Sequence, residues 1–165
     1  MKRSYVSGNE NGSVLIVSLV ILALLVIIGI SATTTSNIEN LVTRNVEQYT
    51  VALYLAEAAA MEGIQSLDDV APNPRDNPPG WLNPTMDAVT DADILDDNYW
   101  AGGAPYTPGA GVGSSQLLGE SHGVVGGSSL DMGKSNVYGY TIYGRGQSPT
   151  GGLVLVGVGY RRAFQ

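Results

Sequence analysis

The sequence contains no cysteine and only one histidine, His122, among its 165 residues. The absence of cysteine excludes a disulfide framework and a thiolate metal site. A Ser–His–Asp catalytic site would have to use His122, which lies in a glycine-rich stretch, and no serine stands in a nucleophile motif. The glycine-rich segments also lack the G-x-x-x-x-G-K-[ST] pattern of a phosphate-binding loop. We therefore expect neither an enzyme nor a bound cofactor.

Basic residues are also few, since eight lysines and arginines stand against fifteen acidic residues, for a net charge of −7. Contacts with phosphates require clustered lysine and arginine, so the composition argues against direct binding of nucleic acid. Four acidic residues in the middle of the chain are weak candidates for calcium ligands: Asp91, Asp93, Asp96 and Asp97. Their spacing lacks the glycine and the closing glutamate of an EF-hand loop. A solvated acidic loop without metal is the interpretation that we favour.

The dominant feature that is present is an apolar run from Val14 to Ile30, interrupted only by Ser18 and Gly29. A polar leader, residues 1–12, precedes it and ends in glycine. As a helix with a rise of about 1.5 Å per residue, the run would reach roughly 26 Å, close to the ~30 Å hydrocarbon thickness of a bilayer. The run is therefore long enough to cross a membrane.

Three interpretations of this run are open. In a secretory signal peptide, Lys2 and Arg3 would form the basic region and cleavage would follow Ser31, although the run exceeds the usual apolar core of about 7–15 residues. In an uncleaved signal anchor, the same two basic residues would hold the N-terminus on the cytoplasmic side. The third interpretation rests on the glycine directly before the run. That layout resembles a type IV prepilin, in which a membrane peptidase cuts after Gly12 and leaves the apolar helix on the mature protein.

The residues after the run predict a long helix with a weak zone. Thr33, Thr34 and Thr35, together with Gly29, lower the helix propensity. One interpretation of this zone is that it lies at the membrane–water interface. The other is that it unwinds when the helix packs into a filament. A helical period then returns, with apolar residues three and four apart, and predicts an amphipathic helix. The stripe that we expect to pack on a small domain comprises Ile38, Leu41, Val42, Val46, Tyr49, Leu53, Ala56, Ala60, Ile64 and Leu67.

The middle of the chain, residues 68–135, is rich in proline, aspartate and glycine. Proline breaks long helices, so we expect only one short helix here, with Thr90 or Asp91 as its N-cap. From Gly102 to Gly133 we expect long loops with at most short strands. The aromatic residues expected to anchor this region to the core are Trp81, Tyr99, Trp100 and Tyr106.

The C-terminal segment, residues 136–165, predicts an antiparallel β-hairpin. Residues 137–145 and 153–164 are rich in β-formers, and a loop with glycine and proline connects them. In the second strand one side is bulky, while the other thins out to Gly157 and Gly159, where another element can approach. The bulky side, Val154, Val156, Val158 and Tyr160, is expected to pack on the long helix, because so small a sheet needs a helix to bury a core. The predicted fold class is therefore α+β, with a small antiparallel sheet.

The motifs at both ends resemble those of the PilX family of type IV pilus minor pilins. At the N-terminal end they are the glycine before the apolar run, Gly-x-Ser-Ala at 29–32 and Ala-Glu-Ala-Ala at 56–59. At the C-terminal end they are Gly-Arg-Gly at 144–146 and Tyr-Arg-Arg at 160–162. The resemblance implies a pilin fold with a leader at 1–12. The assembly half of the helix would then occupy 13–36, and a periplasmic domain 37–165.

The resemblance also implies roles for single residues. The peptidase would cut between Gly12 and Ser13, and Ser13 would be N-methylated. Val17 and Gly29 are the assembly positions. Major pilins carry a glutamate at the place of Val17, and that carboxylate pairs with the terminal ammonium of a neighbouring subunit. A carboxylate in lipid is costly unless it is paired, so valine here fits a subunit at the filament tip, although it also simply fits an apolar surface.

The partners that the resemblance implies are the prepilin peptidase, the major pilin, other minor pilins and a tip adhesin. The implied location is the inner membrane, crossed once with the N-terminus in the cytoplasm and the C-terminus in the periplasm. After assembly the protein would lie in the extracellular pilus, which serves adhesion and twitching motility. A minor pseudopilin of a type II secretion system and a signal-anchored exported domain are the alternatives.

Overall fold

The computed structural model describes residues 10–69, 77–84, 89–102, 104–106, 113–126 and 136–164. Most of the predicted leader and the side chain of Tyr106 lie outside the described residues. The chain divides into two compact units, Met1–Arg44 and Asn45–Gln165, and each is described by itself.

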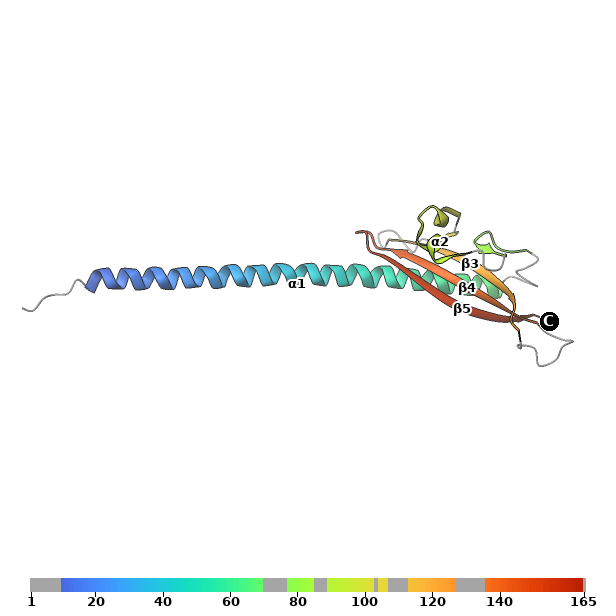
Figure 1. Ribbon diagram of the computed structural model, residues 1–165, viewed down its shortest axis with the longest axis horizontal. Helices are drawn as coiled ribbons and strands as arrows, with labels where there is room; N and C mark the ends of the chain where they lie inside the picture. Colours follow the sequence, from blue (N-terminus) through green and yellow to red (C-terminus); the bar gives the residue numbers. More distant parts are fainter. Residues whose placement is uncertain are drawn as a thin grey trace, which may run out of the picture. The chain divides into compact units, whose positions relative to one another are not determined.

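One α-helix, α1 (Glu10–Asp69), supplies the N-terminal unit and the first part of the second unit (Figure 1). It contains no proline, and alanine, leucine and glutamate, which are strong helix formers, are frequent in it. The helix continues through the threonine zone that follows Gly29. The long helix predicted from the apolar run and the amphipathic period is therefore confirmed.

The second unit contains a five-stranded sheet in the order β1-β3-β4-β5, with β2 also paired to β3. The strands are β1 (Leu82–Asn83), β2 (Ala104–Tyr106), β3 (Ser114–Val124), β4 (Asn136–Gln147) and β5 (Leu153–Phe164). β4 and β5 form the predicted antiparallel hairpin. The expectation of a wholly antiparallel sheet is corrected by β1, which pairs parallel to β3. Parallel neighbours need a crossover of about a dozen or more residues, and the chain between Asn83 and Ser114 provides it.

β3 corrects the prediction that residues 102–133 form long loops. It is 11 residues long and lies between β4 on one side and β1 and β2 on the other. Serine and glycine give it a weak intrinsic preference for strand, so pairing and packing decide its structure. A Cβ at Gly119 would lie 2.6 Å from Cζ3 of Trp81, which shows how closely the indole covers this strand. His122 accordingly lies on β3 and not in a loop.

The short helix α2 (Asp91–Leu95) confirms the prediction for this segment, with Thr90 as its N-cap. The Thr90 hydroxyl accepts a hydrogen bond from the Asp93 backbone N–H, and the Asp93 carboxylate accepts one from the Thr90 backbone N–H. This capping box satisfies two donors that a helix start leaves without partners. The hydroxyl of Thr90, and then its backbone N–H, lower the pKa of Asp93 because both donate to the ionised carboxylate. A 3₁₀ turn, η1 (Tyr99–Gly102), follows.

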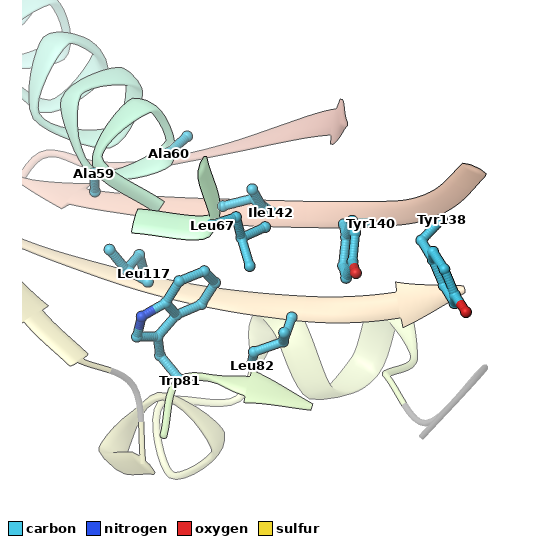
Figure 2. Packing of buried hydrophobic residues seen from close by; sticks show 9 residues of the cluster. All are labelled: Ala59, Ala60, Leu67, Trp81, Leu82, Leu117, Tyr138, Tyr140 and Ile142. Atoms are coloured by element: carbon cyan, nitrogen blue, oxygen red, sulfur yellow. The ribbon is translucent and has the colours of Figure 1, made fainter. Parts of the chain in front are cut away.

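The core lies between the C-terminal part of α1 and one face of the sheet. Figure 2 shows three residues of β4, Tyr138, Tyr140 and Ile142, in a row along the strand, with Leu67 of α1 next to Ile142. The buried cluster comprises Ala59, Ala60, Leu67, Trp81, Leu82, Leu117, Tyr138, Tyr140 and Ile142. Trp81 and Trp100 are 8% and 1% exposed, so both are buried anchors as predicted.

The predicted apolar stripe of α1 is buried only in its C-terminal part. Its buried members are Ala56, Ala60 and Leu67, and Leu53 is half-buried. Within the second unit, Val46 and Tyr49 are each 58% exposed, which corrects the expectation that the stripe packs on the domain along its whole length. The fully buried contact is made largely by alanines, because the sheet approaches the helix backbone closely. On β5, Val158 and Tyr160 pack against the core cluster, which confirms the predicted orientation of that strand.

Candidate assembly site

The apolar residues of α1 from Val14 to Ile30 form a continuous exposed surface. The large aliphatic side chains in this range are 51–68% exposed, and none of this part of the helix is buried. Within the described residues, α1 is the one helix that is long and apolar enough to cross a membrane. Exposed apolar surface of this extent is costly in water. The segment therefore requires an apolar environment, which a bilayer or the neighbouring helices of a fibre would supply.

Four hydroxyl groups in and after this segment donate hydrogen bonds within the helix. Ser18 donates to the Val14 carbonyl at 2.7 Å, and Thr33 donates to the Gly29 carbonyl at 2.9 Å. The hydroxyls of Thr34 and Thr35 make the same bond to the carbonyl four residues earlier. In an apolar medium a polar group without a hydrogen bond costs several kcal/mol. The threonine zone is thus compatible with an apolar surrounding as well as with an interface.

The predicted processing and assembly residues all lie on this exposed part of α1. Gly12 and Ser13 fall in the first turn of the helix, which begins at Glu10. A Cβ added at Gly12 or at Gly29 would meet nothing within 4 Å. Packing within the chain therefore does not require glycine at either place, and a requirement for it would come from another molecule. Val17 is 54% exposed and is likewise available to a neighbour.

The two glycines of the Gly-Arg-Gly motif lie against the alanines of α1. A Cβ at Gly144 would overlap the carbonyl oxygen of Ala56 and would lie 2.9 Å from the backbone nitrogen of Ala60. A Cβ at Gly146 would overlap the carbonyl oxygen of Ala52 and lie 2.9 Å from Cβ of Leu55. β4 thus rests directly on the helix backbone. The motif near position 57 and the motif near position 145 form one contact, although they lie far apart in the sequence.

The Tyr-Arg-Arg motif of β5 binds the C-terminal end of α1. The Tyr160 hydroxyl donates to the Asp68 carboxylate, and the Arg162 guanidinium donates to the Leu67 carbonyl. Arg162 Nε also lies 3.9 Å from Asp68 Oδ1. A cation at this end offsets the partial negative charge of the last helical carbonyls. Burial, and then the hydrogen bond to Asp68, raise the pKa of Tyr160 to about 12.

Three of the four acidic residues considered as calcium ligands have other roles in the structure. Asp93 caps α2, and Asp96 accepts hydrogen bonds from the backbone and side chain of Asn98. Asp97 forms an ion pair with Arg145, whose guanidinium carbon lies 5.8 Å from the ring centroid of Trp100. No group of three or more histidine, aspartate or glutamate residues in the described part of the chain is placed to hold a metal ion.

The comparisons with known proteins bear on the N-terminal segment. The PilX N-terminal family model matches residues 11–60. The match supports a PilX-type pilin, and the α+β layout of the whole chain fits a pilin fold. No curated protein and no solved structure matches the chain.

The PilX match spans the Gly12–Ser13 junction, the exposed apolar surface and the Ala-Glu-Ala-Ala motif at 56–59, in which the Ala56 carbonyl lies against Gly144 of β4. It ends before the sheet, so the contacts of Gly144 and Tyr160 come from the structure alone. Sequence reasoning found these C-terminal residues as motifs but not as contacts. The close approach expected at Gly157 and Gly159 of β5 was placed on the wrong strand, since a Cβ at Gly159 would meet nothing within 4 Å and one at Gly157 only the Tyr143 ring. The glycines at alternate positions 144 and 146 of β4 are the signal that could have indicated the approach of the helix.

Proposed function

We propose that the protein is a minor pilin, a structural and non-catalytic subunit that helps to initiate or cap the assembly of a type IV pilus. The observation that carries the proposal is the PilX match to residues 11–60 on a helix whose apolar half is wholly exposed. Burying that surface against neighbouring helices would release about 25 cal/mol per Å² of apolar area. That gain is relative to water; relative to the bilayer, association of the helices rests on van der Waals packing between them.

In this function the subunit waits in the inner membrane with its sheet domain in the periplasm and then enters the fibre. The prepilin peptidase cuts between Gly12 and Ser13, and the new terminal amine of Ser13 is methylated. The subunit works in a tip complex with other minor pilins above the major pilin, and a tip adhesin is its outward partner. The exposed Val17 supports a place at the tip, since it offers no carboxylate to a neighbouring terminus.

The experiment that tests this proposal is the localisation of the protein on sheared fibres with a gold-labelled antibody. We expect sparse label at fibre ends, while an antibody against the major pilin decorates the whole length. Fibre assembly should fall in a strain that lacks the protein and return when it is supplied again. Even labelling along wild-type shafts would contradict the tip position, and fibres without any label would contradict the pilin function.

A further inference from the structure

The face of the sheet opposite α1 carries a groove near the start of β4 and the end of β5. Side chains alternate across a strand, so Gly139 and Thr141 point away from the core that Tyr140 and Ile142 enter. The groove has a volume of about 640 Å³, within the range of roughly 300–1,000 Å³ that is typical of small-molecule sites. Its lining residues are His122, Val125, Gly139, Tyr140, Thr141, Gly159, Tyr160 and Arg161.

The floor of the groove is backbone, because glycine occupies one position on each of two neighbouring strands. Gly139 pairs with Arg161, and Gly159 pairs with Thr141. A Cβ at Gly139 would lie 2.9 Å from Cγ2 of Val125, so this valine closes one side of the floor. A Cβ at Gly159 would meet nothing within 4 Å. The glycine at 159 is thus not required by packing inside the protein, and it leaves open space above β5.

The polar side chains around this floor are suited to donate hydrogen bonds. Arg161 is exposed, and a guanidinium binds a carboxylate or phosphate through paired N–H donors. His122 Nε2 lies 2.6 Å from Thr141 Oγ1. With the ring hydrogen on Nε2, the imidazole donates to Thr141 and leaves the hydroxyl hydrogen for a ligand.

The described residues that line the groove include no acidic side chain, although the protein carries a net charge of −7. Glu120 is the register partner of Thr141 on β3. Its side chain is buried, and its carboxylate accepts a hydrogen bond from the Val89 backbone N–H at 3.4 Å. The groove therefore combines hydrogen-bond donors of positive or neutral charge with a flat floor of backbone.

We propose that this groove binds a small organic anion, with its acidic oxygens on Arg161 and Thr141 and its body on the glycine floor. A ring can lie flat there because no side chain rises from Gly159. The chemistry that the site recognises is an oxyanion, supplied either by a carboxylate or by a phosphate. This binding activity is independent of the assembly function proposed for α1.

The test is a nuclear magnetic resonance titration of the full chain in detergent micelles. The probes are galacturonate and glucose 6-phosphate, with galactose and glucose as their uncharged counterparts. We expect saturable shifts at His122, Thr141 and Gly159 with one or both acids and none with the neutral sugars. A response to one acid alone identifies the oxyanion as carboxylate or phosphate. Equal responses to acids and neutral sugars, or no saturable shift with either acid, would overturn the proposal.

Variants make the test specific for the groove. Arg161→Gln should weaken binding about tenfold or more, because a charge-assisted hydrogen-bond pair is lost. Arg44→Gln makes the same change of charge on α1 and should leave binding unchanged. Gly159→Val should fill the floor while keeping the parent's melting temperature, since its Cβ enters open space. If Arg161→Gln and a folded Gly159→Val both bind as the parent does, the assignment is wrong.

Discussion

At the scale of single residues, the contacts of Gly144 and Gly146 with the backbone of α1 leave no room for a side chain. A methyl group at Gly144 would overlap the Ala56 carbonyl, which belongs to a helix backbone and cannot rotate away. We predict that Gly144→Ala destabilises the protein by about 1–3 kcal/mol, the usual cost of overpacking a core. Thermal unfolding monitored by circular dichroism measures the loss. Gly159→Ala is the matched control, because its methyl group enters open space, and an equal loss in both variants would contradict this packing.

A second prediction at this scale concerns Tyr160 and the dependence of the protein's stability on pH. Its pKa in the folded protein is raised to about 12 from a usual value of 10.0. The folded state therefore favours the protonated phenol, and the resulting stability is complete below pH 10 and is lost as the pH rises toward 12. Tyr160→Phe should remove this part of the alkaline loss of stability.

The readout for Tyr160 is the difference in unfolding free energy between the parent and Tyr160→Phe, measured by urea unfolding from pH 8 to about pH 12. The difference is needed because burial also raises the pKa of Tyr143, which titrates in both proteins. A difference that stays constant across this range would show that the pKa of Tyr160 is not raised in the folded protein.

The residue-scale contacts were only partly predictable from sequence. Gly12, Ser13 and Gly29 stand out because they interrupt or adjoin an apolar run. Val17 is itself apolar and stands out only through the resemblance to pilins. The hydrogen bond from Tyr160 to Asp68 joins residues 92 positions apart, so no local pattern indicates it. Only the folded arrangement, in which β5 lies beside the end of α1, brings the two residues together.

At the scale of elements, the apolar start of α1 is the part that processing would act on. The Gly12–Ser13 bond lies in the first turn of the helix, where ends fray readily, so a peptidase could gain access to an extended bond. We predict that Gly12→Val blocks cleavage, since the added side chain enlarges the residue at the scissile bond. Nothing within 4 Å of this position would resist the side chain, so folding should be unaffected.

Intact-mass measurement of protein from cells with active prepilin peptidase checks the processing prediction. The parent should begin at Ser13 with a methylated amine, and the Gly12→Val protein should keep its leader. Gly29→Val serves as the control, because it changes a glycine in the same helix away from the junction. A parent chain that begins at Ala32 would indicate a signal peptide instead.

Elements differed in how far the sequence could predict them. β4 and β5 are rich in β-branched and aromatic residues and flank a turn with glycine and proline, so their hairpin could be predicted. β3 could not, because serine and glycine make up five of its 11 residues and its pairing with neighbours on both sides holds it in place. The apolar period of α1 also predicts a longer buried stripe than the structure has. Periodicity marks an apolar face, but it does not show whether that face meets this chain or another one.

At the scale of the whole molecule, the apolar half of α1 is exposed, whereas the core of the sheet domain is buried within the chain. The core is closed within the chain by alanine and glycine contacts. The apolar half has no such cover in its own unit, and its large side chains are 51–68% exposed between Val14 and Ile30. A subunit built in this way should fold its domain first and gain its helix partners only on assembly.

The identity of residue 17 then bears on where the subunit lies in a fibre. Val17 removes the carboxylate that would pair with the terminal ammonium of a neighbour, so the parent protein should occupy the tip. Val17→Glu should permit incorporation along the shaft, because a carboxylate in an apolar surrounding gains most from a paired cation. Gold label on sheared fibres should then move from the ends to the whole length.

Val20→Glu is the matched control, since it places the same charge on the same exposed helix about one turn further on. At this position the carboxylate lies further from the end of the chain, where the ammonium of a neighbour would approach. Label confined to fibre ends with Val17→Glu, at a protein level equal to that of the parent, would show that residue 17 does not set the position. Label along the shaft with both variants would show that a negative charge at either position permits incorporation along the shaft. That result would contradict a specific pairing at residue 17.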